Sequence, residues 1–273
     1  MLNLDQSVSQ VSGILATTEP EEVLNRYGNP DLTMVLVKSP HTKLAAEKCS
    51  KLVGRNGLVL TLQNGLGNRE LLAKVIGDES RILQAVTSQG STILDSGMVR
   101  HTGNGLTSLA YTPDNYHEVK EIADMLTKAG IQCSMIRNLE SMLWGKLIIN
   151  AGINPITALL RVKNGELLEN ETCRELLTKT VGEAVTVANA RGIQLPYDNP
   201  LENVLSVAKA TSGNISSMLA DVMRGTTTEI DSINGAIVSE GEKLGVPVWT
   251  NRTLVDLIHS ISIRDSSQTK LVI

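Results

Sequence analysis

Short apolar runs alternate with helical stretches in the first half of the chain. The run DLTMVLVKS begins at Asp31 and lies between the dipeptides at 29–30 (Asn-Pro) and 39–40 (Ser-Pro). A continuous apolar run bounded by turn residues is typical of a strand buried on both faces of a parallel sheet. Residues 42–52 follow with helical spacing, and GLVLTLQ at 57–63 is a second apolar run. This order of strand, helix and strand predicts a βαβ unit.

The same alternation continues to about Arg137. The segment NGLGNRELLAKVIG turns directly into a helix after the second apolar run. Further short strands are predicted over residues 81–86, 97–101, 106–111 and 132–136, with a helix over 116–129. Alternating strands and helices at this spacing indicate an α/β domain with a doubly wound sheet over residues 1–137.

The second half of the chain, residues 138–273, has few strand-like runs and long stretches of helical periodicity. Stop signals such as Gly192, Gly245 and Pro247 separate these stretches. Helices are predicted over residues 139–150, 173–191, 201–210, 230–244 and 250–263. We therefore predict a second, all-helical domain over residues 138–273.

Composition and charge exclude several classes of protein. The 273 residues have a formal net charge of −4, and 41% of them are hydrophobic, which is typical of a globular protein. With two Trp, four Tyr and no Phe, the chain offers few rings for base stacking, so nucleic acid is not expected as a partner.

The cysteine pattern and the hydropathy indicate a soluble, cytoplasmic protein. Cys49, Cys133 and Cys173 form no CxxC pair and have no histidine at ligand spacing, so neither a disulfide framework nor a metal site is predicted. No uninterrupted apolar run approaches the roughly 18 residues that a membrane-spanning helix needs. The amino terminus lacks the pattern of a signal peptide.

One glycine-containing turn has the character of a ligand-binding loop. Gly65-Leu66-Gly67 follows a predicted strand and precedes a helix, but Glu70 stands where a GxGxxG motif needs its third glycine. Such a turn can bring backbone N–H groups to an anionic or polar ligand. A plain tight turn explains the same residues, so both interpretations stand.

The segment WGKLIINAGINPITALL carries the most informative polar residues. Lys146, Asn150 and Asn154 are spaced by four, so they share one face of a helix. Residues on both sides of Lys146, such as Trp144 and Leu147, are apolar, which indicates a buried helix. Partial burial would lower the pKa of this lysine and prepare it to donate a proton to a substrate oxygen.

An acidic residue near a predicted helix start has two interpretations. Thr226 or Thr227 followed by Glu229 fits the beginning of a helix, where carboxylates are favoured. Glu229 could equally contact a ligand. In another segment, His101 begins the polar turn HTGNG, which could face a cleft.

Eight segments resemble the ketopantoate reductase family. They are VLVKSPHT (35–42), LQNGLGN (62–68), VTSQGS (86–91), HTGNG (101–105), WGKLIINAGINPITAL (144–159), NGEL (164–167), NISSMLAD (214–221) and TEIDSINGAIV (228–238). They occur in family order from about residue 14 to near 254. The resemblance implies a partial Rossmann-like domain followed by a helical domain like the C-terminal domain of 6-phosphogluconate dehydrogenase.

The resemblance also implies an activity. Family members use NADPH to reduce 2-dehydropantoate, a small 2-oxoacid, to (R)-pantoate in pantothenate and coenzyme A biosynthesis. Lys146 matches the catalytic lysine, which donates a proton to the carbonyl that receives hydride. Independently of the resemblance, the helical second half permits a homodimer. The matching cofactor-binding positions are Lys38, Asn64, Ser91 and Glu229, and the substrate-binding positions are Asn64, Asn150, Asn154, Asn164 and Ser217.

One departure from the family opens alternatives. Family members begin with a strand, a GxGxxG motif and a helix, whereas this chain has no glycine before Gly13. By the size of a βα half-unit, about 40 residues are expected to be absent. Three hypotheses follow: a reductase whose sequence is shortened, a truncated non-catalytic relative that acts by binding, or a reductase of another 2-oxoacid or β-hydroxyacid on the same scaffold.

Overall fold

The computed structural model describes residues 1–267, and contacts divide the chain into two compact units. Unit 1 comprises residues 1–37, 41–63 and 68–139. Unit 2 comprises the helical second half from residue 140 together with two loops of the first half, Lys38–Pro40 and Asn64–Gly67. The last part of the predicted helical domain, residues 268–273, lies outside the described residues.

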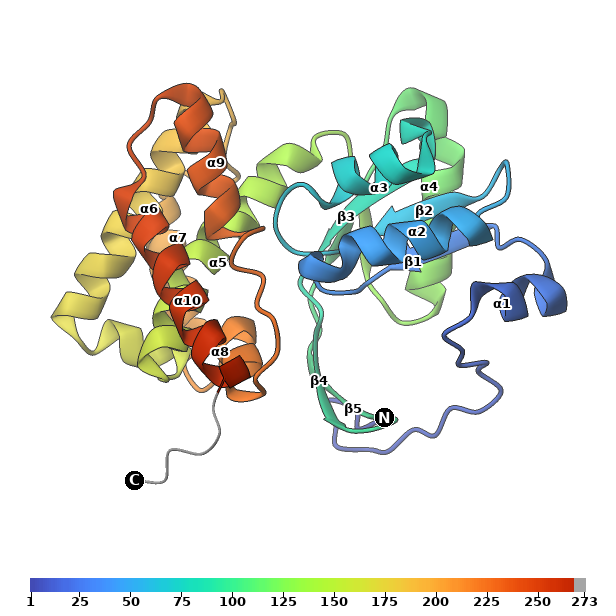
Figure 1. Ribbon diagram of the computed structural model, residues 1–273, viewed down its shortest axis with the longest axis horizontal. Helices are drawn as coiled ribbons and strands as arrows, with labels where there is room; N and C mark the ends of the chain where they lie inside the picture. The colour runs from blue at the N-terminus through green and yellow to red at the C-terminus, as the bar shows by residue number, and fades with distance from the viewer. Residues whose placement is uncertain (268–273) are drawn as a thin grey trace. The chain divides into compact units, whose positions relative to one another are not determined.

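Unit 1 is built on a five-stranded sheet with the order β1-β2-β3-β6-β7 (Figure 1). Neighbouring strands are parallel except β3 and β6, which are antiparallel. The strands are β1 (Leu32–Val35), β2 (Leu58–Thr61), β3 (Ile82–Thr87), β6 (Thr107–Ala110) and β7 (Cys133–Ile136). The helices are α1 (Pro20–Tyr27), α2 (Thr42–Leu52), α3 (Asn68–Ile76) and α4 (Tyr116–Lys128).

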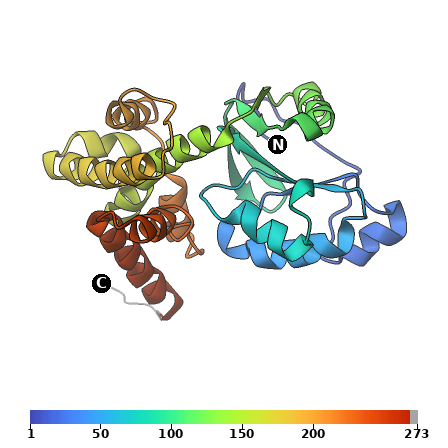
Figure 2. The ribbon, with the colours of Figure 1, turned by 90° about the horizontal axis from the view of Figure 1, so that it is seen from above.

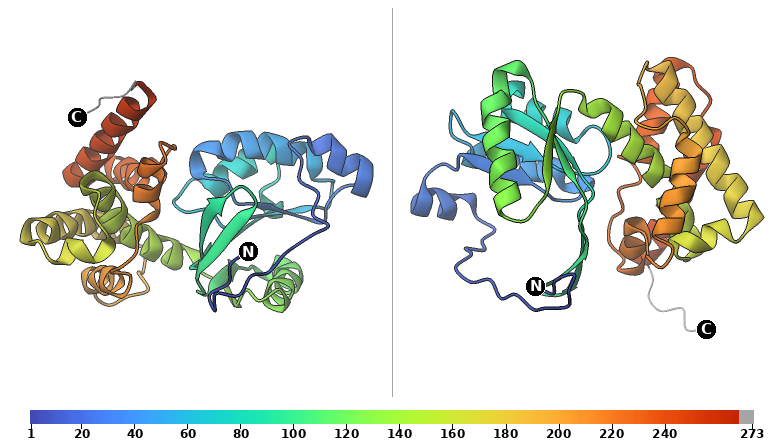
Figure 3. Two further views of the ribbon diagram at one scale, coloured as in Figure 1. Left: turned by 90° about the horizontal axis from the view of Figure 1, so that it is seen from below. Right: turned by 180° about the vertical axis from the view of Figure 1, so that it is seen from behind.

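Helices cover both faces of this sheet, as a doubly wound fold requires. On one face, Val35, Val59 and Ile82 form an apolar cluster with residues of α2 and α3. On the other, Leu60 and Leu83 cluster with residues of α4. Figure 2 and Figure 3 show α4 on the side of the sheet opposite to α2 and α3. Residues 59 and 60, and likewise 82 and 83, therefore alternate between two apolar layers.

The strand β1 differs from its prediction. We expected the run from Asp31 to be buried on both faces, but Leu36 is 63% exposed and β1 ends at Val35. The reason is its position, because β1 pairs only with β2 and lies at an edge of the sheet. An apolar run alone does not distinguish a central strand from an edge strand.

Two elements of unit 1 were missed. Helix α1 has only eight residues and buries only Pro20, and β4 (Gly90–Asp95) is mostly exposed. β4 pairs with β5 (Met98–Gly103) in a separate two-stranded ribbon, which Leu2 joins through a bridge to Arg100. Figure 3 shows this ribbon with the amino terminus beside it.

Unit 2 consists of helices around one apolar core. The core is aliphatic apart from Trp144, as the lack of Phe requires. The helices are α5 (Leu139–Leu160), α6 (Glu171–Ala190), α7 (Pro200–Ala210), α8 (Ser217–Met223), α9 (Asn234–Leu244) and α10 (Trp249–Ser267), with a single 3₁₀ turn at Asn164–Leu168.

Helix α5 is longer than predicted, because it continues through Pro155 to Leu160. Proline has no N–H, so the carbonyl oxygen of Ala151, four residues earlier, loses its helical donor. The side-chain amide of Asn234 on α9 donates to this oxygen at 3.2 Å. The missing hydrogen bond is thus replaced from another helix, which the local sequence cannot reveal.

By length and composition α5 could also cross a membrane, and among the described helices it alone meets that test. However, 67% of its apolar window is buried inside the protein. Its residues Trp144, Leu147 and Ile148 belong to the unit 2 core. This burial is typical of a core helix.

Candidate functional site

Glu229 joins the two first-half loops to the helical unit. It lies before α9 and is 7% exposed. Its Oε1 accepts hydrogen bonds from Ser39 N at 3.1 Å and Ser39 Oγ at 3.0 Å, while its Oε2 accepts one from Asn64 Nδ2 at 3.2 Å. The capping interpretation of Glu229 is therefore wrong, since α9 begins at Asn234 and the carboxylate instead bonds residues far away in the sequence.

The glycine turn packs against the segment that follows Glu229. Leu66 N donates to the carbonyl oxygen of Ser232 at 3.0 Å, and a Cβ on Gly65 would lie 2.3 Å from that oxygen. Gly65 also has a φ of 82°, in the left-handed region. Both observations require glycine, so the turn is specified by close packing as well as by backbone conformation.

Lys146 lies half-buried on α5, within the electrostatic reach of Glu229. Burial lowers the pKa of Lys146 from 10.5 to about 8, and the negative charge of Glu229 partly opposes this shift. Loss of hydration destabilises the ammonium form more than the neutral amine. Lys146 is therefore an acid of moderate strength that can donate its proton near neutral pH.

The predicted substrate residues of unit 2 fall into two groups. Asn150 and Asn154 follow Lys146 on α5 at intervals of four residues, and Asn154 Nδ2 donates to Ser217 Oγ at 3.4 Å. Asn154 and Ser217, predicted separately, are thus brought together. Ser217 is exposed at the beginning of α8, whereas its neighbour Ser216 is buried and caps the helix by accepting from Leu219 N.

Asn164 is held in a different set of contacts. Its Nδ2 donates to Thr211 Oγ1 at 2.9 Å, and its backbone N donates to the carbonyl oxygen of Asn214. Its buried Oδ1 has no hydrogen-bond partner among the described residues. These contacts join the turn after α5 to the loop between α7 and α8, so Asn164 shapes the backbone that leads to Ser217.

Two further residues of the sequence analysis lie in unit 1. Ser91 is on β4, paired with His101 of β5. The ring of His101 has hydrogen-bond contacts with Gln89 Oε1 at 3.0 Å and with the carbonyl oxygen of Gly103 at 2.9 Å. His101 thus stabilises the β4–β5 ribbon through its own contacts.

The sequence analysis missed two residues of this site. Ser39 supplies two of the three donors to Glu229, and Asp221 on α8 forms an ion pair with Lys38. Only Asp221 gave a signal in the sequence. It is a single carboxylate among the apolar residues of SMLADVM, which is unusual for a helix that packs against a core.

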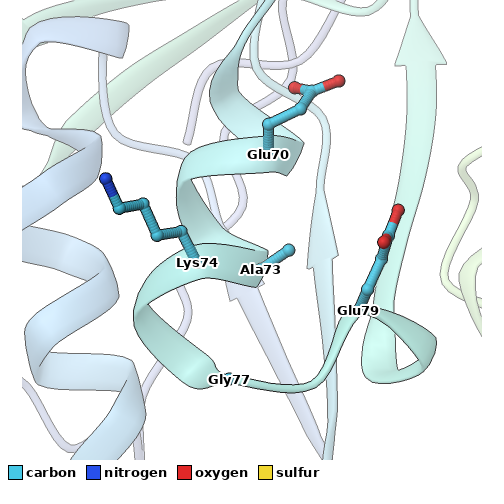
Figure 4. A pocket seen from close by; sticks show the side chains of 5 residues that line it. All are labelled: Glu70, Ala73, Lys74, Gly77 and Glu79. Carbon is cyan, nitrogen blue, oxygen red and sulfur yellow. The ribbon is translucent and has the colours of Figure 1, made fainter.

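Unit 1 also has a hollow of about 440 Å³, lined by Glu70, Ala73, Lys74, Gly77 and Glu79. Figure 4 shows Lys74 and Glu70 extending from α3 in different directions. None of the predicted site residues lines this hollow. Within the part of the chain that the structure describes, no group of His, Cys, Asp or Glu side chains is arranged to hold a metal ion.

Two family models match the chain. The one described as "Ketopantoate reductase PanE/ApbA" matches residues 4–114, and the one described as "Ketopantoate reductase PanE/ApbA C terminal" matches residues 138–262. A 2-dehydropantoate 2-reductase from Archaeoglobus fulgidus is 36% identical over 249 residues, covering 91% of this chain and 80% of the relative.

Solved structures give the same result. A PanE/ApbA family ketopantoate reductase from Ralstonia eutropha superposes with a TM-score of 0.87 and 28% identity, over 97% of this chain and 84% of the other. A D-mandelate dehydrogenase, solved with NADH and anilino(oxo)acetate, has a TM-score of 0.81 and 25% identity, over 87% and 78% of the two chains. The predicted fold, a Rossmann-like α/β domain followed by a helical domain, is confirmed.

Proposed function

We propose a reaction for this chain on the premise that it belongs to the ketopantoate reductase family of oxidoreductases. The reaction is the NADPH-dependent reduction of 2-dehydropantoate to (R)-pantoate. The observation that carries the proposal is Lys146, whose pKa burial lowers to about 8 beside the carboxylate of Glu229.

The residues of unit 2 fit the nicotinamide end of such a cofactor. A carboxylate has about four acceptor positions, and three on Glu229 are used by Ser39 and Asn64 within the described part of the chain. One position on Oε2 is therefore available for a ribose hydroxyl, and the Asn64 amide adds a second polar group. We assign the nicotinamide end to Asn64 and Glu229, with Lys38 as a nearby cation.

The phosphate end is matched less well. No GxGxxG sequence occurs anywhere in the 273 residues, and the turn Gly65-Leu66-Gly67 is occupied by packing against Ser232. Measured binding of NADPH is therefore the first test of the proposal.

The chemistry of the chain's own residues follows from their positions. When bound, the cofactor supplies the hydride that converts the keto carbon into a secondary alcohol. Lys146 Nζ donates a hydrogen bond to the keto oxygen and transfers its proton there as negative charge develops. Asn150, Asn154 and Ser217 hold the carboxylate and hydroxyl of the substrate without adding charge, and Asn164 shapes the loop beside them.

The experiment has two stages. First, NADPH binding to the purified chain is measured by calorimetry, and micromolar affinity is expected. Second, NADPH absorbance is followed with 2-dehydropantoate, and a decrease is expected only when enzyme and substrate are both present. Binding without turnover would instead support the non-catalytic relative, and the absence of both would contradict the proposal.

A second candidate is reduction of another 2-oxoacid, which the likeness to D-mandelate dehydrogenase favours. One methyl group changes binding in a pocket by only about 1–3 kcal/mol, so small differences in the wall decide the substrate. Comparing kcat/KM for 2-dehydropantoate with that for the 2-oxoacid of mandelate separates the two candidates. The first candidate function, reduction of 2-dehydropantoate, predicts a clearly higher kcat/KM for 2-dehydropantoate.

We propose in addition that residues 1–137 act as the nucleotide domain and residues 138–273 as the substrate domain. We also propose that the protein is cytoplasmic.

We further propose that the protein forms a homodimer. An apolar cavity of about 470 Å³ in unit 2 supports the dimer, since Leu160, Leu257 and the 77% exposed Trp249 surround it. Exposed apolar surface of this kind is typical of an association site. Sedimentation of the wild type and Trp249→Ser tests the dimer, and a monomeric wild type would contradict it.

A further inference from the structure

Asp221 is a buried carboxylate for which the proposed chemistry has no use. It lies on α8 and is 2% exposed, between Leu219 and Val222, which are also buried. Burying a carboxylate among apolar side chains is costly unless partners compensate for the lost hydration. The contacts of Asp221 must therefore compensate for the hydration that its carboxylate loses.

The partner of Asp221 is Lys38, which forms an ion pair with Oδ1. The Asp221 side chain is almost fully buried, whereas the Lys38 side chain is 39% exposed. The hydroxyl of Thr226 lies 3.5 Å from the same oxygen. Burial raises the pKa of Asp221, and Lys38 opposes this shift. Asp221 is therefore the fixed member of the pair, and the lysine reaches it from the loop Lys38–Pro40.

Two neighbouring residues of this loop bind two different carboxylates. Lys38 binds Asp221, and Ser39 donates twice to Glu229. Glu229 is close enough for its charge to act on Asp221. Because Lys38 is bonded to Ser39, its ammonium group can also approach Glu229. In the structure Glu229 instead accepts from the neutral donors of Ser39 and Asn64 and keeps its charge for Lys146.

We propose that Asp221 is a positioning residue that holds Lys38 and keeps its positive charge off Glu229, so that Glu229 acts on Lys146. This inference rests on the proposed function, in which Lys146 donates the proton. The charged groups involved are Lys38, Arg224 and Glu229 around Asp221, and Glu229 around Lys146.

The test is Asp221→Asn, which keeps the shape of the side chain and removes its charge. Lys38 then pairs with Glu229, which no longer supports the ammonium form of Lys146. The pKa of Lys146, about 8, predicts an alkaline limb of the kcat profile near this pH in the wild type, and we expect Asp221→Asn to move the limb down by roughly half a pH unit. A merely structural role would change thermal stability and leave this limb in place.

A double variant separates the positioning role of Asp221 from a merely structural role. In Lys38→Gln with Asp221→Asn, Lys38 no longer competes for Glu229, so the limb is expected to return to its wild-type position. Asp221→Glu keeps the ion pair and is expected to leave the limb unchanged. If Asp221→Asn does not fold, Asp221→Leu, which removes the buried polar group altogether, carries the same expectation as the single variant.

A readout without substrate keeps this test separate from that of the proposed function. The pKa of the Lys146 ammonium is followed by NMR in the wild type and in each variant. A lower pKa in Asp221→Asn that recovers in the double variant supports the inference, even if the wild type has no reductase activity. An unchanged pKa in Asp221→Asn, or a change that persists in the double variant, overturns it.

Discussion

The two units bury different kinds of polar group. In unit 1 the buried polar residues of the described chain are neutral: Thr42, Thr61, Gln63, Asn68, Thr107 and Ser108. In unit 2 they include the carboxylates Asp221 and Glu229, with the ammonium of Lys146 close by. Neutral groups satisfied by hydrogen bonds cost little on burial, whereas charges cost several kcal/mol in order of magnitude. Unit 1 is thus organised for stability, and unit 2 accepts a cost for reactive groups.

Lys146→Met is expected to have the largest effect, because it removes the buried ammonium of unit 2. Turnover is expected to fall by roughly 100- to 10,000-fold, because the proton donor is lost. The free energy of unfolding at neutral pH is expected to rise by about 3 kcal/mol, because the cost of burying the ammonium disappears. Reductase assays and urea titrations measure the two effects. Lys209→Met, at an exposed lysine of α7, is the control and should change neither.

The same residue predicts how stability depends on pH. The folded pKa of Lys146, about 8, lies below the ordinary 10.5, so between these values the folded state binds fewer protons than the unfolded state. The contribution of Lys146 is therefore unfavourable below pH 8 and diminishes as the pH rises toward 10.5. In Lys146→Met, this rise of the unfolding free energy between pH 8 and 10.5 should be absent. Urea titrations across this range measure it, and a rise of the same size in the variant would contradict the prediction.

Leu60→Ala tests the stabilising role of unit 1. Leu60 is fully buried in the unit 1 sheet beneath α4, and a cavity there is expected to cost about 2–5 kcal/mol of unfolding free energy. The pH profile of kcat should keep its shape, because no charged group is involved. Thermal melting and assays at several pH values provide the measurements. A shifted alkaline limb would contradict the comparison, because it would show that packing in unit 1 affects the charged groups of unit 2.

Glu229→Gln sharpens the comparison within unit 2. The amide keeps an acceptor oxygen but removes the charge that favours the ammonium form of Lys146. We expect kcat above neutral pH to fall by about tenfold, with the alkaline limb at lower pH. Glu242→Gln, at an exposed carboxylate on α9, is the matched control. A parallel fall at every pH would mean that Glu229 acts by shape alone.

Thr107→Val should have the smallest effect. The hydroxyl groups of Thr107 and Thr87 are 2.8 Å apart between β6 and β3. Losing one partner is expected to cost about 1 kcal/mol of unfolding free energy. Urea titration of this variant measures the loss. A loss of several kcal/mol would show that this neutral pair contributes as much as a buried charge.

Local patterns predicted the elements well, but not the contacts between distant residues. Apolar spacing predicted α2 over residues 42–52, and the structure confirms it. The same spacing ended α5 too early, because the donor to Ala151 comes from Asn234. Glu229 resembled a helix cap because its donors, Ser39 and Asn64, lie in the first half of the chain.

The candidate site shows the same limit. The column of Lys146, Asn150 and Asn154 followed from helical periodicity, and burial of the lysine followed from its apolar neighbours. The pairing of Asp221 with Lys38 could not be predicted, since 183 residues separate the two partners. The catalytic, cofactor-binding and substrate-binding roles of all the candidate residues stay predictions.

The protonation of Lys146 in the folded protein tests the central claim most directly. The side-chain ammonium is followed by NMR as the pH is raised, and its resonance is assigned with the Lys146→Met variant. The account predicts a midpoint at about 8 that moves lower in Glu229→Gln. A midpoint near 10.5, insensitive to Glu229, would mean that this lysine is an ordinary hydrated amine and would contradict the account.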